Sequence, residues 1–163
     1  GSTAHLGMEL LKSKMPGMRP VHVPYQGNPA VVTALLSGDI QMALVPPGIV
    51  LPHVKTGRLR IVGLTSGRSI LVPDVVSLNE VGLQDFNLEV WTALVGPAKL
   101  SAAAQERIKA EVPKLFRTPE VRQRLFLIGW NTVGSSAEGL HHRVADEGTA
   151  LRAIIKAANI KVE

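Results

Sequence analysis

The stretch from residue 19 to residue 65 alternates extended runs with helical segments, and this alternation limits the possible folds more than any other feature. Within VHVPYQGNPAVVTALLSGDI (residues 21–40), an extended run stops at Pro24, turns through Tyr25–Asn28 and continues as a helix. Extended runs are expected over 19–24, 40–45 and 59–65, with helices over 29–36 and 47–55 between them. This order predicts βαβ units and a mostly parallel sheet, and therefore an α/β fold whose ligand-binding loops follow the strands.

Helical patterns dominate the rest of the chain. A helix is expected over 3–15, with Ser2 or Thr3 as its N-cap and Pro16 after its end. Residues 66–85 are rich in loop-forming residues, with a short turn near 77–81. Later elements are expected as extended runs over 87–95 and 130–133 and as helices over 102–116, 119–128 and 136–158. Two extended runs among three helices are too few for a complete lobe of their own.

Composition excludes several classes of protein. The net charge of +5 is spread along the chain, with 7 Lys/Arg against 5 Asp/Glu up to Leu88 and 11 against 8 afterwards, which argues against a nucleic-acid-binding stripe. The basic residues of 105–124 alternate with acidic ones, as on a solvated helix face. Without cysteine, the chain has no disulfide and no thiolate metal site. No apolar run reaches the roughly 18 residues that a transmembrane helix needs.

No motif for catalysis or for a cofactor stands out. The chain lacks GxGxxG, GxxxxGK[ST], HExxH and GxSxG patterns, and it has no obvious acid–base pair. We therefore predict no catalytic residue, no cofactor and a protein that is not an enzyme. His141 and His142 near Asp146 and Glu147 could share a helix face and bind a metal, but an exposed helix surface is the favoured interpretation, and no metal site is predicted.

Two small polar loops precede helices and draw more attention. Ser2 and Thr3 stand before the first helix, and Gly27 and Asn28 stand before the second. Helix N-termini offer unpaired N–H groups and the positive end of a dipole, which suits a carboxylate. Ordinary helix capping explains the same residues, and spacing alone leaves both readings open. The other histidines (His5, His22 and His53) are scattered, and we interpret each as a structural hydrogen-bonding residue.

Five segments occur in an order that resembles one protein family. They are STAHLGMELL, HVPYQGNPAVVTALLSGDI, LPHVKTGRLRIVGLTSGRS, VPDVVSLNEVGL and VWTALVGPA, followed by PEVRQRLFLIGW and IIKAANIKVE near the end. Together they resemble the Bug family of periplasmic solute receptors of tripartite tricarboxylate transporters, and the likeness extends over essentially the whole chain. It implies a type II, Venus-flytrap fold of the periplasmic-binding-protein kind, in which two α/β lobes enclose a carboxylate.

The resemblance also implies how the chain is divided. Residues 1–88 match most of the second lobe, and residues 89–163 match the returning strand and the C-terminal helices of the first lobe. Family members are nearly twice as long, so we expect the N-terminal half of the first lobe, and the signal peptide before it, to lie outside this sequence. The C-terminal helices would then expose apolar faces, and we expect self-association through them.

The resemblance assigns binding roles to three loops. Ser2 and Thr3 match the family's hydroxyl residues that offer donors to a ligand carboxylate. Tyr25, Gln26, Gly27 and Asn28 match a PYKG loop at the cleft, with Gln26 where lysine is common. Val45, Pro46 and Pro47 stand at a strand end where many members carry an aspartate, so a simple or apolar carboxylate is favoured over an amino acid.

The sequence therefore predicts a periplasmic receptor that captures a small carboxylate and delivers it to the permease of a tripartite tricarboxylate transporter. Alone, the chain is expected to bind weakly or not at all, because one wall of the cleft is missing. The alternative is a sensor or protein-interaction module that descends from such a receptor, has lost transport and self-associates. Partners are thus a small carboxylate, permease components and a second copy of the chain, without nucleic acid.

Overall fold

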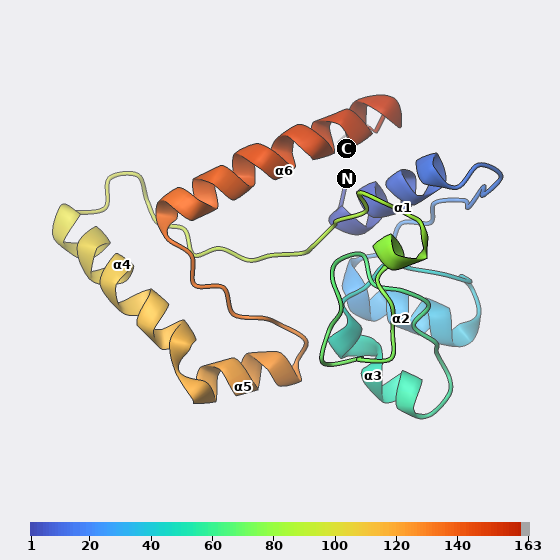
Figure 1. Ribbon diagram of the computed structural model, residues 1–163, viewed down its shortest axis with the longest axis horizontal. Helices are drawn as coiled ribbons and strands as arrows, with labels where there is room; N and C mark the ends of the chain where they lie inside the picture. The colour runs from blue at the N-terminus through green and yellow to red at the C-terminus, as the bar shows by residue number, and fades with distance from the viewer. Residues whose placement is uncertain (161–163) are drawn as a thin grey trace. The chain divides into compact units, whose positions relative to one another are not determined.

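The computed structural model describes residues 1–160, which form two compact units. Unit 1 consists of Gly1–Val90 together with the chain from Ala153 onward, and unit 2 is Trp91–Arg152. The helices along the described chain (Figure 1) are α1 (Thr3–Lys14), α2 (Gly27–Ser37), α3 (Pro47–Lys55), the 3-10 helix η1 (Leu78–Val81), α4 (Ala102–Arg117), α5 (Pro119–Leu127) and α6 (Ala137–Ala157). The division into lobes at residue 88 that the resemblance implies stays a prediction.

The helices lie close to where the sequence predicts them. Ser2 caps α1 and Ser101 caps α4, each accepting a hydrogen bond from the backbone N–H three residues later. Pro47 occupies the first turn of α3, where its missing N–H costs no hydrogen bond. The predicted start of α2 is wrong by two residues. The helix begins at Gly27, and Asn28 lies inside it instead of capping it.

The predicted strands are the main difference. Within residues 1–160 no β-strand forms, and the only bridge is a parallel pair between Leu64 and Ser77. There the Leu64 N–H donates to the Val76 carbonyl at 3.0 Å, and the Leu78 N–H donates to the Leu64 carbonyl at 2.9 Å. The segments 19–24, 40–45, 59–65, 87–95 and 130–133 are non-helical but do not pair as ladders. A strand needs a neighbour's backbone groups in register, which a hydrophobic pattern does not supply.

The buried core lies in unit 1. Phe86 is fully buried, and Ser77 is the buried polar residue beside the core. The other buried apolar side chains come from α1, α2, α3 and the loops after them, namely Leu6, Val32, Ala34, Val50, Leu64 and Val72. The three loops predicted to bind a ligand all belong to this unit, so they are carried by elements with a core of their own.

Candidate functional site: three helix N-termini in unit 1

The first loop is the start of α1. Ser2 is exposed, and its Oγ accepts a hydrogen bond from the His5 N–H at 3.3 Å while its carbonyl accepts one from the Leu6 N–H at 3.0 Å. An accepting hydroxyl keeps its own proton to donate, so capping does not exhaust Ser2. Thr3 is the first residue of the helix and is half-buried. No acidic residue stands in the first turn, so the positive end of the helix dipole is not neutralised locally.

The second loop leads into α2 and lacks a side-chain cap. Gly27 has a φ of +79°, a conformation that favours glycine, and its N–H donates to the Tyr25 carbonyl at 3.1 Å. Gln26 occupies the N-cap position without a capping hydrogen bond, and the first turn holds no acidic residue. Gln26, Gly27 and Asn28 are exposed, whereas Tyr25 is half-buried. The Gly27 N–H is already bonded and Pro29 has no N–H, so the Asn28 N–H is the first-turn donor that an anion can use.

The third loop, at the start of α3, is different in character. Val45, Pro46 and Pro47 are half-buried, and Pro46 is the N-cap residue. None of the three side chains carries a donor or a charge, so the loop offers apolar surface beside a helix N-terminus. It places no carboxylate that would repel an anionic ligand.

Two contacts connect these loops. The rings of His5 and His22 stack with their centroids 3.9 Å apart and their planes 9° from parallel, which joins α1 to the segment just before Tyr25. Gly7, in the second turn of α1, faces Leu44, and a Cβ at Gly7 would lie only 2.5 Å from Leu44 Cδ1. Leu44 precedes the third loop directly. The structure therefore connects the first two turns of α1 to both other segments, and the binding role of the nine residues stays a prediction.

The pKa of His5 is lowered below its ordinary value. Burial is the main cause, followed by the neighbouring His22 ring. Glu9 acts in the opposite direction, and the Lys12 amine that pairs with Glu9 at 2.8 Å adds to the lowering. The neutral ring of His5 is therefore favoured in the folded chain.

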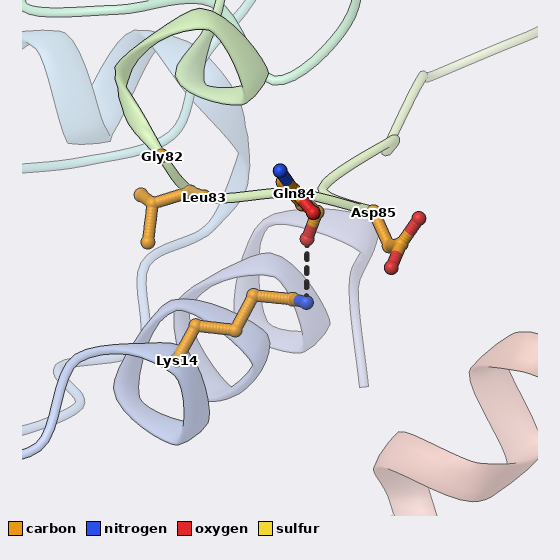
Figure 2. Close-up of a pocket in the computed structure, with 5 residues that line it drawn as sticks. All are labelled: Lys14, Gly82, Leu83, Gln84 and Asp85. Carbon is orange, nitrogen blue, oxygen red and sulfur yellow. Dashed lines mark hydrogen bonds between the residues drawn. The ribbon is translucent and has the colours of Figure 1, made fainter.

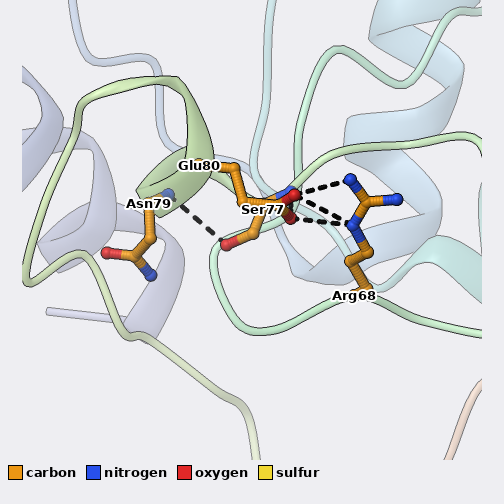
Figure 3. Close-up of polar contacts among 4 residues, drawn as sticks. All are labelled: Arg68, Ser77, Asn79 and Glu80. Carbon is orange, nitrogen blue, oxygen red and sulfur yellow. Dashed lines mark hydrogen bonds and ion pairs between the residues drawn. The ribbon is translucent and has the colours of Figure 1, made fainter.

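A cluster that the sequence analysis did not single out surrounds η1 (Figure 3). Ser77 and Glu80 form a capping box, in which the Ser77 N–H donates to Glu80 Oε1 at 3.0 Å and the Asn79 N–H donates to Ser77 Oγ at 3.4 Å. The Arg68 guanidinium contacts both Glu80 oxygens, at 2.6–3.0 Å. The spacing Ser-x-x-Glu in the sequence is the signal that could have revealed this cap.

The two charged side chains of this cluster, Arg68 and Glu80, pair with each other. The hydrogen bond from Arg68, and then that from the Ser77 backbone, hold the pKa of Glu80 below its ordinary value, and Glu80 in turn raises the pKa of Arg68. Asn79 closes the following loop, since its Nδ2 donates to the Phe86 carbonyl at 2.9 Å and its Oδ1 accepts from the Phe86 N–H at 3.0 Å. We interpret the cluster as structural.

A shallow hollow lies beside the end of α1, and its lysine is already hydrogen-bonded to the chain. It is lined by Lys14 and Gly82–Asp85, and Figure 2 shows the Lys14 amine directed at the Gln84 carbonyl, to which it donates at 2.6 Å. The hollow contains none of the nine predicted binding residues. Because its one cation is already bonded to a carbonyl, it is a poor site for an anion.

The histidine and acidic residues of α6 that could share a helix face do not form a metal site. Glu147 accepts hydrogen bonds from Trp91 Nε1 and from Arg143 Nε, each at 2.6 Å, and the guanidinium of Arg143 lies 5.8 Å from the Trp91 ring centroid. His142 lies 3.9 Å from Glu138. Among residues 1–160 no group of three or more histidine, aspartate or glutamate side chains could hold a metal ion.

The basic stretch around α4 and α5 carries ion pairs on its surface. Lys109 pairs with Glu106, Lys114 with Glu111, and Arg124 with Glu120, at 2.8–3.0 Å. This is the solvated face that the alternating charges predict. In the part of the chain that the structure describes, no helix is both long and apolar enough to cross a bilayer.

Comparison with known proteins decides the family. Residues 1–160 match the family described as tripartite tricarboxylate transporter family receptor. The chain belongs to this family. The resemblance inferred from the sequence segments is thereby confirmed, and the family is one of receptors, not of enzymes.

The curated relatives are distant in sequence, but the matches extend over most of this chain. The chain is 29% identical to a UPF0065 protein from the tcbD-tcbE intergenic region of Pseudomonas sp. (strain P51), over 86% of this chain and 42% of that protein. It is 24% identical to the protein BugT of Bordetella pertussis, over 100% of this chain and 50% of BugT. The chain thus spans about half the length of these relatives.

Solved structures establish the fold. An R. palustris protein with adipate matches with a TM-score of 0.87 and 22% identity over 98% of this chain and 54% of its own. The periplasmic binding protein BugD matches with a TM-score of 0.78 and 18% identity, over 98% and 54%. MatC from Rhodopseudomonas palustris, with bound malate, matches with a TM-score of 0.79 and 23% identity, over 94% and 53%. The predicted fold class, that of periplasmic binding proteins, is confirmed.

Proposed function

We propose that the chain is part of a periplasmic receptor that captures a small carboxylate in a cleft between two lobes and delivers it to the permease of a tripartite tricarboxylate transporter. The observation that carries this proposal is the family match over residues 1–160. The periplasmic location is supported by the likeness to BugD, whose description is that of a periplasmic binding protein. Since the chain spans about half of its relatives, we expect it to supply one wall of the cleft.

The geometry of unit 1 supports an anionic ligand. α1, α2 and α3 all begin without an acidic residue in their first turns, and α2 has no side-chain cap. We infer that the Ser2 and Thr3 hydroxyls and the Asn28 N–H donate to the ligand carboxylate, while Val45–Pro47 contacts its carbon chain. Backbone donors at helix N-termini favour carboxylates without needing a cation.

A dicarboxylate without an amino group is the ligand class that we propose. The two ligand-bound relatives carry adipate and malate, and neither molecule has an ammonium group. Val45, Pro46 and Pro47 offer no carboxylate that could pair with an amino acid's ammonium group. Malate and adipate are therefore suitable probes, and the uncharged diamide of malate is the matched control ligand.

Titration of the ¹⁵N-labelled chain with malate and adipate tests the site directly. We expect amide shifts confined to Ser2, Thr3, Gly27 and Asn28, with a Kd of about 1 mM or weaker because one wall alone binds. Ser2→Ala should weaken these shifts. Ser101→Ala is the matched control, because Ser101 caps α4 with the same 3.3 Å hydrogen bond. Equal shifts with the diamide, or equal effects of the two variants, would refute the assignment.

We also propose that the chain self-associates through apolar side chains of unit 2. Eight of them are exposed by about two fifths of their surface or more, namely Leu94, Val95, Ile108, Leu115, Leu127, Ile128, Val133 and Val144. Exposed apolar area of this kind is a driving force for association. Light scattering should give a multiple of the 17.4 kDa chain mass, reduced by Leu127→Lys and not by Val62→Lys in unit 1. A mass of 17.4 kDa at all concentrations would contradict the proposal.

A further inference from the structure

The stacked histidines are placed to control the candidate site. His5 lies three residues after Ser2, and His22 lies three residues before Tyr25, so this one ring contact joins the segments that carry the first and second loops. The stacking separation of 3.9 Å, with nearly parallel planes, is a close aromatic contact. His22 itself is exposed and His5 is half-buried, so protons from solvent can reach the pair.

The surroundings of His5 favour its unprotonated state. The nearest carboxylate on α1, that of Glu9, is paired with Lys12 through both oxygens at 2.8 and 2.9 Å. Glu9 therefore offers little compensation for a positive charge on His5. The lowered pKa of His5, caused first by burial and then by His22, is in keeping with this arrangement.

We propose that the His5–His22 stack is a pH-sensitive contact that holds the first two loops in place at neutral pH and releases them on acidification. When both rings are protonated, like charges at stacking distance repel and the contact is lost. The start of α1 and the Tyr25–Asn28 loop then move independently. The part of this inference that concerns ligand rests on the proposed function, and it assigns to the site a lower carboxylate affinity at acid pH.

Two opposing effects of protonation on affinity can be separated by salt. Added positive charge attracts an anion, but this attraction is screened over about 8 Å at physiological ionic strength. The hydrogen bonds from Ser2 and from the start of α2 need both loops in position, and a displacement of a loop removes them whatever the salt concentration. We therefore expect loss of affinity to prevail in 0.15 M salt, a condition for which that screening length applies.

Amide hydrogen exchange on the free chain tests the contact without any ligand. The reporters are the His5 and Leu6 amides, which donate to Ser2, and the Gly27 amide, which donates to the Tyr25 carbonyl. After correction for the intrinsic exchange rate, their protection should fall severalfold between pH 8 and pH 5. The Leu88 amide, which donates to the Thr65 carbonyl at 2.9 Å, should not follow them.

Variants show whether the two histidines are responsible. His5→Phe with His22→Phe keeps two stacked rings that cannot titrate, so protection of the reporters should no longer depend on pH. His22→Phe alone also removes the repulsion and serves if the double variant does not fold. His141→Gln, on exposed α6, should leave the wild-type pH dependence intact. A pH-independent wild type, or a pH dependence retained in both Phe variants, overturns the proposal.

Malate affinity then links the contact to the site. We expect wild-type affinity in 0.15 M salt to fall severalfold from pH 8 to pH 5, and affinity of the double variant to change less. An affinity that rises on acidification overturns the inferred effect on ligand. A chain that binds neither malate nor adipate at any pH would refute the proposed function, whereas the exchange experiment would still decide the fate of the histidine contact.

Discussion

Unit 1 and unit 2 differ in what holds them together. All seven buried apolar residues of the described chain belong to unit 1, and no residue of unit 2 is buried. Unit 2 is stabilised by a serine cap on α4, by surface ion pairs such as Lys109–Glu106, and by the Trp91–Glu147–Arg143 contacts. Exposed ion pairs contribute little, at most about 1 kcal/mol each, whereas each buried apolar side chain contributes about 1.5–3 kcal/mol.

The difference indicates which unit can carry a site. Hydrogen bonds to a carboxylate require donors held to within a fraction of an ångström, and loops attached to a packed core meet this requirement. The three candidate loops are attached to the core of unit 1. Both units leave large apolar side chains exposed, such as Val62 in unit 1 and Leu127 in unit 2, but unit 2 has no buried side chain to hold a loop in place.

Removing the centre of the core should produce the largest effect. Phe86 is 0% exposed, and Phe86→Ala should lower the free energy of unfolding of unit 1 by about 3–5 kcal/mol. Phe116→Ala, at a half-buried position of unit 2, should cost much less. Circular dichroism in urea measures the loss. Both tryptophans, Trp91 and Trp130, lie in unit 2, so their fluorescence should barely report the Phe86 substitution. Equal costs for the two substitutions would contradict the comparison.

Loss of the Asn79 clasp, the two hydrogen bonds between the Asn79 side chain and the Phe86 backbone, should have the next-largest effect on stability. Asn79→Ala leaves the N–H and the carbonyl of Phe86 without their partners, which should cost about 1–3 kcal/mol. The control is Asn131→Ala, at an exposed position of unit 2, for which we expect a change within about 0.5 kcal/mol. If urea midpoints shift equally for both, the two hydrogen bonds to Phe86 do not stabilise the loop.

The helices could be predicted from sequence because their signals are local. Pro47 with the apolar residues after it predicts α3 at its observed bounds, and Ser101 predicts the start of α4. The start of α2 was predicted two residues late because Asn28 is a good capping residue. Gly27, in its positive-φ conformation, starts the helix instead. The sequence predicts strands that do not pair as ladders within residues 1–160, because pairing depends on distant backbone groups, such as those of Leu64 and Val76, that a local pattern does not specify.

The residues of the candidate site could be named from the sequence, but the contacts between the segments that carry them could not be predicted. Its nine residues come from the family resemblance and remain a prediction. The stack of His5 on His22 was missed, because single histidines 17 positions apart show no pattern in the sequence. The Asn79–Phe86 clasp was missed for the same reason. Contacts of this kind depend on how two segments pack, and local propensity carries no information about it.

The contacts of Glu147 in unit 2 should have a modest effect on stability. Glu147 accepts from Trp91 and from Arg143, and Glu147→Ala should destabilise unit 2 by about 0.5–1.5 kcal/mol. It should also shift the emission of Trp91 to the red, because the indole N–H then donates to water. Trp130→Phe isolates the Trp91 signal. Glu138→Ala, on the same helix, is the control. An unchanged spectrum would show that the contact is not formed in solution.

The smallest effect should be a pH dependence confined to unit 1. The pKa of Glu80 is held below its ordinary value of 4.5, first by the hydrogen bond from Arg68 and then by that from Ser77. In acid the unfolded chain therefore binds the proton at this carboxyl more readily than the folded chain does. The stabilisation is complete above about pH 4.5 and is lost as the pH falls through the lowered pKa.

Glu80→Gln removes this contribution, so the variant should lose less stability than the wild type between pH 5 and pH 3, as measured by urea unfolding at each pH. Both side chains are exposed, and added salt should therefore reduce the difference. Glu106→Gln removes an exposed ion pair of unit 2 and should leave the acid dependence of unit 1 unchanged. If Glu80→Gln followed the wild type at every pH, the Arg68–Glu80 pair would be a surface contact without thermodynamic weight. The stability of unit 1 would then rest on its apolar core and on the Asn79 clasp.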